Sequence, residues 1–352
     1  MNVIGHTLCG IMLLANVFVG AGYLFCAYSQ YLSPVAFPVF SCAGLFFPVF
    51  LLLDFLFLLF WLVVRLKYAL IPLVFLLAGW NSLQVYTPFH GRKEPQGEGI
   101  LKFLTYNVMG MPSEDTDTVN PIVEYIRRTD ADVVCLQEYP SYKKEIESQL
   151  SFYPYRKVFS TPGWNSMACL SKFPILSVEK IAYESAGNGS FLLRLKMAED
   201  TLVVVCNHLE SNKMDTHDKE VYEGILKSPG EENVKSGGKY LLRKLADAAA
   251  IRAPQADSVA MAISRNRCPY MLVCGDFNDS PLSYARRVIS EGLHDAYVEA
   301  GWGPGISYNR NFLFFRIDHM FVGSGFRVLD AEVDNSIDAS DHYPLWCTVE
   351  KL

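Results

Sequence analysis

The sequence predicts a membrane-anchored α/β protein, in which three apolar segments precede one large soluble domain. Three observations support this. Only three Asp, Glu, Lys or Arg residues occur in residues 1–90, namely Asp54, Arg65 and Lys67. From residue 100 onwards, short apolar runs alternate with segments of helical pattern. Several of these runs end abruptly in Asn, Asp, Glu or His, at the strand tips where α/β proteins build their sites.

Residues 8–28, 35–64 and 69–87 are each about the length of a bilayer-spanning helix, roughly 20 residues or more. The second segment contains Pro38, Pro48 and Asp54, which predicts a kink or a division into two shorter re-entrant pieces. A carboxylate inside a membrane is costly, so Asp54 is expected to have a partner. The first segment has neither a basic N-terminal region nor a small-residue cleavage site, which argues against a cleaved signal peptide.

Basic residues between the spans predict the orientation of the chain. Arg65 and Lys67 lie between the second and third segments, whereas residues 1–7 and 29–34 contain no Lys or Arg. The positive-inside rule then keeps the Arg65 loop in the cytoplasm and puts the soluble domain outside it. Arg92 and Lys93 argue for the opposite orientation.

Charge and cysteine content narrow the function of the soluble part. Outside the three segments, 29 Lys and Arg residues accompany 36 Asp and Glu residues, a net charge of −7. Tight non-specific binding to a nucleic-acid backbone favours the opposite sign. Six of the nine cysteines lie outside the segments, and no pair has metal-ligand spacing, which favours buried free thiols over a disulfide framework.

The soluble domain is expected to begin after a polar linker over residues 91–99 and to fill residues 100–352. Its first half is predicted as a strand over 100–106, a helix over 118–129, a strand over 132–137, antiparallel short strands within 152–196 and a strand over 202–206. Its second half is predicted as helices over 216–227 and 239–265, a strand over 271–274, a helix over 282–291, and strands over 317–322 and 343–349.

The two helices between the strands at 202–206 and 271–274 exceed what a simple crossover needs. Their polar, Gly-rich joint predicts that residues 212–265 form a substrate-gating cap over the site, and the alternative is a helical excursion that only packs on the sheet. Pro254 is expected to kink or split the second helix.

Polar residues at the strand boundaries are the candidates for function. In the stretch YMLVCGDFND, Gly275 is expected to let a ligand approach the backbone, while Asp276 and Asn278 point to one face if the segment is extended. The full set of such residues is Asn107, Glu138, Asn207, His208, Asp276, Asn278, Asp318, Asp341 and His342.

In this order the motifs TYNV, LQEY, CNHLES, CGDFND, RIDHMF and SDHYPLW resemble those of the endonuclease/exonuclease/phosphatase (deoxyribonuclease-I-like) superfamily. The resemblance covers residues 100–352 and leaves out the apolar segments. It implies a four-layer α/β sandwich, in which two mixed sheets pack face to face with helices outside. It also implies a divalent-metal-dependent phosphoester hydrolase. The histidine of CNHLES sides with the deoxyribonuclease-I-like, sphingomyelinase-like and inositol-phosphatase-like branches, although the extended basic motif expected of inositol 5-phosphatases is missing.

The resemblance, together with the chemistry of hydrolysis, implies a role for each residue. Glu138 and Asn107 would bind Mg²⁺, with Mn²⁺ as an alternative, and Asp341 would support a second-sphere or second-metal contact. Asp318 and His342 would form the dyad that deprotonates the attacking water. Asp276 would orient that water or complete the base network. Asn278 and His208 would hold the phosphoryl oxygens, and His208 would also protonate the leaving group.

Two functions from different classes follow. The first is an active membrane-tethered phosphodiesterase or phosphatase, whose substrate is a lipid, a small molecule or a nucleic acid. The second is a catalytically inactive sandwich that serves as a membrane-tethered binding module. Loss of a core ligand would favour the second, and every expected ligand is present in the sequence.

Overall fold

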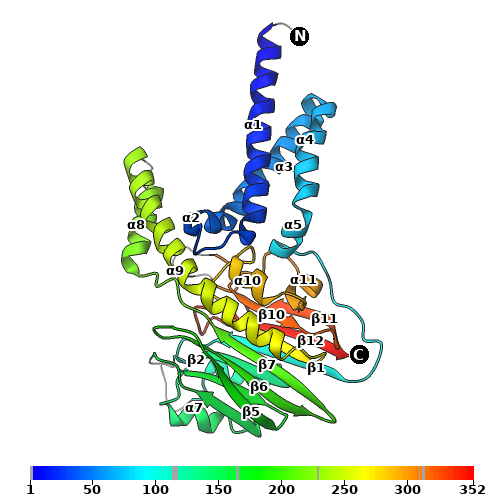
Figure 1. The fold of residues 1–352 in the computed structure, drawn as a ribbon, viewed down its shortest axis with the longest axis vertical. Coiled ribbons are helices and arrows are strands. Elements are labelled where there is room, and N and C mark those ends of the chain that lie inside the picture. Colours follow the sequence, from blue (N-terminus) through cyan, green and yellow to red (C-terminus); the bar gives the residue numbers. More distant parts are fainter. Residues whose placement is uncertain (1–2, 113–117, 164–165, 228–229, 309, 311–313) are drawn as a thin grey trace.

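The computed structural model describes residues 3–112, 118–163, 166–227, 230–308, 310 and 314–352. A helical bundle formed by the first 86 residues stands on one side of a sandwich of two sheets (Figure 1). The N-terminus lies at the end of the bundle remote from the sandwich, and the C-terminus lies at the sandwich (Figure 1).

Two six-stranded mixed sheets form the soluble domain. The first has the order β11-β12-β1-β2-β4-β3, and the second has the order β5-β6-β7-β8-β10-β9. Parallel pairing occurs between β1 and β2 and between β7 and β8, and the remaining pairs are antiparallel. The strands of the first sheet are β1 (Ile100–Asn107), β2 (Val133–Tyr139), β3 (Tyr155–Phe159), β4 (Ser166–Ser171), β11 (Phe326–Val333) and β12 (Leu345–Lys351). Those of the second are β5 (Ile175–Ile181), β6 (Gly189–Met197), β7 (Asp200–His208), β8 (Met271–Asp276), β9 (His294–Asp295) and β10 (Asp318–Val322).

The main hydrophobic core lies between the sheets and includes Phe103, Cys135, Val204 and Leu272, all fully buried. Helices α6 (Pro121–Thr129) and α7 (Lys144–Gln149) belong to a second core with β1, β2 and β4. Helices α9 (Glu231–Arg265) and α10 (Tyr284–Ile289) belong to a third core with β7 and β8. The predicted α/β sandwich of two packed mixed sheets with outer helices is therefore confirmed.

Most predicted strands occur within a few residues of their expected bounds, but the helices differ more. Helix α8 (Thr216–Lys227) has the predicted bounds, whereas α9 begins at Glu231 rather than at residue 239. The polar joint expected between these two helices is correspondingly shorter, and its residues 228 and 229 lie outside the described residues. Helix α9 also continues through Pro254 instead of splitting there. Four elements were not predicted: α7, β9, α11 (Ala296–Ala300) and β11.

The bundle contains two helices that are long and apolar enough to cross a membrane, over His6–Tyr31 and Pro38–Val64. A third candidate, Leu66–Ala78 with Trp80–Tyr86, is bent by 61° at its break, so the described residues give two to three spans. The elements are α1 (Val3–Tyr28), η1 (Ser29–Tyr31), α2 (Pro38–Ser41), η2 (Cys42–Phe46), α3 (Phe47–Val64), η3 (Leu66–Ala69), α4 (Leu70–Ala78) and α5 (Trp80–Tyr86). The short helices α2 and η2 lie in the second apolar segment, for which the sequence predicted a kink or a division.

Asp54 is fully buried in the bundle and has the polar partner that its cost in a membrane requires. Asn16 on α1 donates from Nδ2 to its carboxylate at 3.4 Å. The Oδ1 of Asn16 in turn accepts a hydrogen bond from Trp61 Nε1 at 3.1 Å. This network ties α1 to α3.

Buried contacts join the bundle to the sandwich. Leu282, which follows β8, packs among Tyr23 and Phe47 of the bundle. A Cβ on Gly44 would lie 2.6 Å from the carbonyl oxygen of Leu282, so only glycine permits this close approach. Arg316 is 2% exposed and donates to the carbonyl oxygens of Val85 and Pro304. The loop that follows Asp276, and Arg316 just before β10, thus both hold the bundle against the sandwich.

Candidate active site

The predicted site residues come together at one edge of the sandwich. Asn107, His208 and Asp276 are the last residues of β1, β7 and β8. Because β7 and β8 are parallel in register, His208 lies beside Asp276, and antiparallel pairing puts Asp318 on the other side of Asp276. A cavity of about 240 Å³ lies at this edge, and its lining includes seven of the nine candidate residues: Asn107, Glu138, His208, Asp276, Asn278, Asp341 and His342. The other two, Asn207 and Asp318, do not line the cavity. Asn207 instead donates from Nδ2 to the carbonyl oxygen of Cys274 at 3.1 Å.

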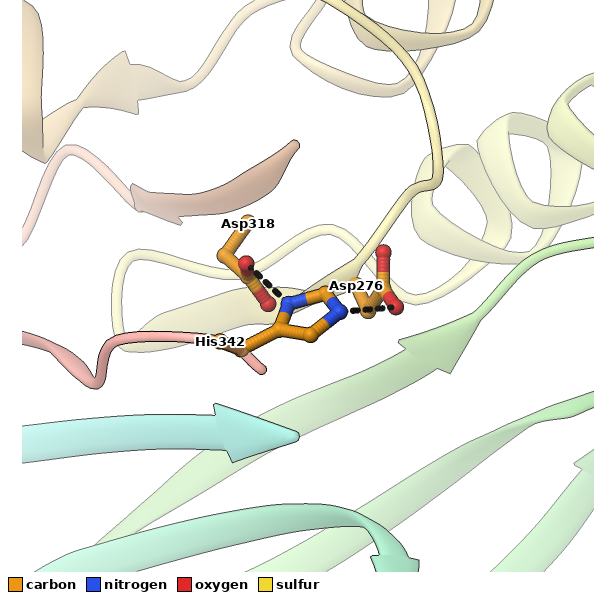
Figure 2. A group of neighbouring side chains, drawn as sticks. All are labelled: Asp276, Asp318 and His342. Atoms are coloured by element: carbon orange, nitrogen blue, oxygen red, sulfur yellow. Dashed lines mark hydrogen bonds and ion pairs between the residues drawn. The ribbon is translucent and has the colours of Figure 1, made fainter. Parts of the chain in front are cut away.

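His342 lies between two carboxylates (Figure 2). Its Nδ1 is 2.8 Å from Asp318 Oδ2, and its Nε2 is 3.7 Å from Asp276 Oδ2. Burial by itself lowers the pKa of His342, but the carboxylates of Asp318 and Asp276 outweigh burial and raise the pKa to about 10. The imidazole is therefore held in its charged form in this arrangement.

Asp276 is 1% exposed, and burial is the largest cause of its raised pKa, with His342 acting in the opposite direction. Its Oδ1 accepts a hydrogen bond from the backbone N–H of Asn278 at 2.8 Å. The opposite oxygen accepts from Asn107 Nδ2 at 3.1 Å, which is a contact between the two sheets. A carboxylate of raised pKa that faces the cavity is a stronger proton acceptor than an exposed one.

Asn107 also donates to Glu138 Oε1 at 3.3 Å, so a single amide bridges two carboxylates. His208 Nε2 lies 3.9 Å from Glu138 Oε1 and 3.7 Å from Asp276 Oδ2. Burial lowers the pKa of His208 in spite of the nearby Asp276 carboxylate. This imidazole is thus held neutral, with one N–H to donate.

The donors in the cavity fit a hard divalent cation. Glu138 faces the cavity with 34% of its side chain exposed, and among the described residues His208 is the one basic group within 4.0 Å of its carboxylate. Asp276 and Asp341 add two further carboxylates to the same lining, which contains no cysteine at the polar edge. Carboxylate and amide oxygens with uncompensated negative charge suit Mg²⁺ or Mn²⁺.

Asp276, Asp318 and His342 also have one potential ligand atom each within 4.8 Å of one another. The hydrogen bond between Asp318 and His342 already uses one atom of each residue. We therefore interpret this group as a triad joined by one hydrogen bond and one ion pair, and not as a ligand shell.

Backbone geometry at the site departs from two expectations. Gly275 was expected to let a ligand approach, but a Cβ there would lie 2.0 Å from the carbonyl oxygen of Asn207 on β7. Glycine is therefore needed at position 275 because β7 and β8 pack too closely there for a side chain. Asn278 has φ 53° and is not extended, and its Nδ2 donates to the carbonyl oxygen of Leu209 at 3.1 Å. Glu138 has φ 52° at a bulge in β2, and such left-handed residues concentrate at functional sites.

Two groups of lining residues were not predicted. Arg252 on α9 is 2% exposed, and it donates to Asp279 at 3.2 Å and to Asn212 Oδ1 at 2.8 Å. Pro34, Ser41, Cys42 and Leu45 come from the bundle, outside the motifs that carry the resemblance. The segment predicted as a cap contributes Asn212, Met214, Leu245, Ala249 and Arg252 to the lining. Its place beside the cavity agrees with a cap, and gating stays a prediction.

His319 lies beside the triad and gives an expected pH dependence of stability. Burial, reinforced by the Arg316 cation, lowers its pKa from 6.5 to about 3. Its Nε2 lies 3.0 Å from the carbonyl oxygen of Asp279. Because the unfolded chain binds this proton and the folded chain does not, the contribution to stability is complete above pH 6.5 and is lost as the pH falls towards 3.

Replacing His319 by glutamine, which keeps a donor but cannot titrate, should flatten the fall of Tm between pH 6.5 and 4. The measurement is thermal unfolding across this range, with the exposed His217→Gln as the matched control. Parallel Tm curves for wild type and His319→Gln would contradict the assignment of acid sensitivity to His319.

Comparison with known proteins agrees with the fold. The sequence model of a domain of unknown function, DUF8431, matches residues 10–86. No curated protein matches the chain. Among solved structures, a humanised D. rerio TDP2 with 14 mutations is 17% identical with a TM-score of 0.53, covering 72% of this chain and 100% of that chain. The human Nocturnin catalytic domain with bound sulfate is 16% identical with a TM-score of 0.51, covering 72% and 94%.

An endonuclease/exonuclease/phosphatase family protein from Bacteroides thetaiotaomicron is 15% identical with a TM-score of 0.51, covering 72% of this chain and 98% of that chain. At these identities the likeness shows the fold. The model of the Endonuclease/Exonuclease/phosphatase family matches residues 104–342, which is more than half of the chain and contains every predicted site residue. The chain therefore belongs to the endonuclease/exonuclease/phosphatase family.

Proposed function

We propose that the protein is a membrane-anchored, divalent-metal-dependent phosphoester hydrolase. Residues 1–90 would be its multi-pass membrane region, 91–99 a linker and 100–352 the catalytic domain. The observation that carries the proposal is the convergence of Asn107, Glu138, Asp276 and His342 on one cavity, with Asp318 hydrogen-bonded to His342. Family membership and the buried Asp/His cluster support the same class of reaction.

Glu138, Asn107 and Asp341 would hold Mg²⁺, or Mn²⁺ in its place. The ion, when bound, supplies positive charge for the phosphoryl oxygens and for the leaving oxygen. These residues are apt because their side chains line the same cavity and all offer oxygen.

The proton chemistry follows from the electrostatics of the triad. Because His342 is held charged between two carboxylates, it is suited to stabilising phosphoryl oxygens. Asp318 orients it through Nδ1. We propose Asp276, whose carboxylate lines the cavity, as the acceptor for the proton of the attacking water, and the Asp318–His342 dyad implied by the resemblance is the alternative acceptor. The raised pKa of Asp276 favours this role.

His208 and Asn278 complete the site. The neutral imidazole of His208 can donate its N–H to a phosphoryl oxygen or to the leaving oxygen. The Nδ2 of Asn278 uses one hydrogen for the carbonyl oxygen of Leu209, which leaves a second for the substrate.

Removal of divalent metal should abolish hydrolysis, and this is the direct test of the proposed function. The full chain, purified in detergent, is assayed with a 4-nitrophenyl phosphodiester after treatment with a chelator and again after addition of Mg²⁺ or Mn²⁺.

Glu138→Gln should raise the metal concentration needed for half activity by about 10-fold or more. Glu124→Gln on the exposed face of α6 is the matched control. Activity that survives chelation would reject metal dependence, and a folded protein with no activity on any phosphoester would favour the binding module.

The orientation of the chain can be tested by protease accessibility in intact cells. The N-terminus and the turn with Arg65 and Lys67 lie at the end of the bundle remote from the sandwich (Figure 1). We propose that this end is cytoplasmic and that the catalytic domain is extracytoplasmic. Added protease should then cleave the domain without lysis. Full protection of the domain until the membrane is broken would reverse the orientation.

A further inference from the structure

The cavity has two chemically different sides. Its polar side is the set of strand-end residues described above. Its other side is largely apolar and is lined by Pro34, Cys42 and Leu45 of the bundle together with Leu245 and Ala249 of α9. An apolar wall contributes nothing to the binding of a phosphoryl group, so it calls for an apolar part of the substrate.

The bundle residues of this wall lie between the cavity and the outer surface of the bundle. Pro34, Ser41, Cys42 and Leu45 line the cavity. Their neighbours Val35, Phe37, Val39 and Phe40 are exposed by 66%, 51%, 45% and 57% on the outside of the bundle. The segment over residues 34–45 thus has one side towards the site and an apolar side towards the lipid.

Packing holds this wall in place. Cys42 is in contact with a small apolar cluster that includes Ala246 and Ala249 of α9, with Leu45 and Leu245 against it. On the opposite side, Gly44 abuts the carbonyl oxygen of Leu282, six residues after Asp276. The wall is therefore in contact with the loop that begins at Asp276.

Charge in the cavity disfavours a polyanion. Among the described residues of the lining, Arg252 is the one Lys or Arg, and its guanidinium is engaged by Asp279 and Asn212. Glu138, Asp276 and Asp341 give the lining an excess of negative charge. A nucleic-acid strand needs several free cations along its path, whereas a single phosphoester needs the metal and a few donors.

We propose that the bundle forms part of the substrate site and that the substrate is a lipid phosphoester. Its headgroup phosphate would lie at the polar side, and its alkyl chain would run along Leu45 and Leu245 towards the bilayer. The inference rests on the proposed hydrolase function and adds the class of substrate and the path by which it arrives. The bundle is then more than an anchor.

The test uses two substrates that differ only in the tail: hexadecyl 4-nitrophenyl phosphate and ethyl 4-nitrophenyl phosphate. The full chain is reconstituted in phosphatidylcholine vesicles, with hexadecyl ester concentration expressed per lipid. Wild type should have a kcat/KM at least 100-fold higher for the hexadecyl ester. Leu45→Asn in the bundle and Leu245→Asn on α9 should each reduce the hexadecyl-to-ethyl ratio at least 10-fold through KM. Partition of the hexadecyl ester into vesicles is the same for every variant, so a change in the ratio reports the site.

Val39→Asn is the matched control, since Val39 belongs to the same segment but faces outwards. Its ratio should stay within twofold of wild type. An unchanged ratio in both wall variants would overturn the proposal, as would faster turnover of a single-stranded oligonucleotide than of the hexadecyl ester. If the wild-type protein hydrolyses neither ester, the proposed hydrolase function is rejected, and the inference with it.

Discussion

Replacing Asp276 by asparagine is expected to lower kcat by a factor on the order of 10³ while the protein stays folded. The substitution keeps the volume of the side chain, and the amide oxygen can still accept from the N–H of Asn278, as Oδ1 of the carboxylate does. It removes the negative charge that faces His342 Nε2 at 3.7 Å and the group that we propose as the proton acceptor. The substitution also removes the acceptor for Asn107 Nδ2, so Tm measured beside kcat separates this structural cost from the loss of chemistry.

The measurement compares kcat for a 4-nitrophenyl phosphodiester with Tm for each variant. Asp200→Asn is the matched control, because Asp200 begins β7 at the opposite end of the same sheet and pairs with Lys351 on the surface. His342→Ala should lose turnover by about 10² or more as well. A folded Asp276→Asn protein with near-normal turnover would remove Asp276 from the chemistry and return the role of base to His342.

The sequence predicts the site because the chemistry is placed at strand ends. An apolar run such as Met271 to Cys274 indicates a buried strand, and the polar residue after it marks the end of that strand. Parallel pairing of β7 with β8 then brings His208 next to Asp276 without any further information from the sequence. The pattern therefore predicts where these strand-end residues lie in the fold, but it does not predict the role that each would have in the reaction.

Long-range contacts account for what the sequence does not predict. The left-handed backbone of Glu138 and Asn278 depends on a bulge and on the carbonyl oxygen of Leu209, and neither has a local pattern. The apolar wall at Leu45 is supplied by a segment whose composition indicates only a membrane location. Helix α9 extends further than predicted, in spite of the weak helix propensity of Gly237 and Gly238, and its extension packs on α8, where a Cβ on Gly237 would meet Ile225 and Val221 at 3.0 Å.

Gly275 combines two demands that no other residue meets. It pairs with Asn207 across the parallel strands β7 and β8, immediately before His208 and Asp276. Its φ is +134°, a conformation that side chains with a Cβ rarely adopt. A Cβ at this position would lie 2.0 Å from the carbonyl oxygen of Asn207 and 2.8 Å from its backbone nitrogen. Both obstacles are backbone atoms of a central strand, so rotation of a side chain cannot relieve them.

Gly275→Ala should therefore destabilise the domain by about 3–5 kcal/mol, which for a domain of this size corresponds to a fall in Tm of roughly 6–20 °C. Because relief of the clash must separate β7 from β8, turnover should fall together with Tm, unlike in Asp276→Asn. The matched control is Gly238→Ala within α9, where a Cβ meets nothing within 4 Å and where alanine favours the helix. Thermal unfolding of both variants in detergent, with activity measured below the lower Tm, separates these cases. A Gly275→Ala protein that melts with wild type would show that the two strands tolerate a wider spacing, and the close pairing of His208 with Asp276 would then need another explanation.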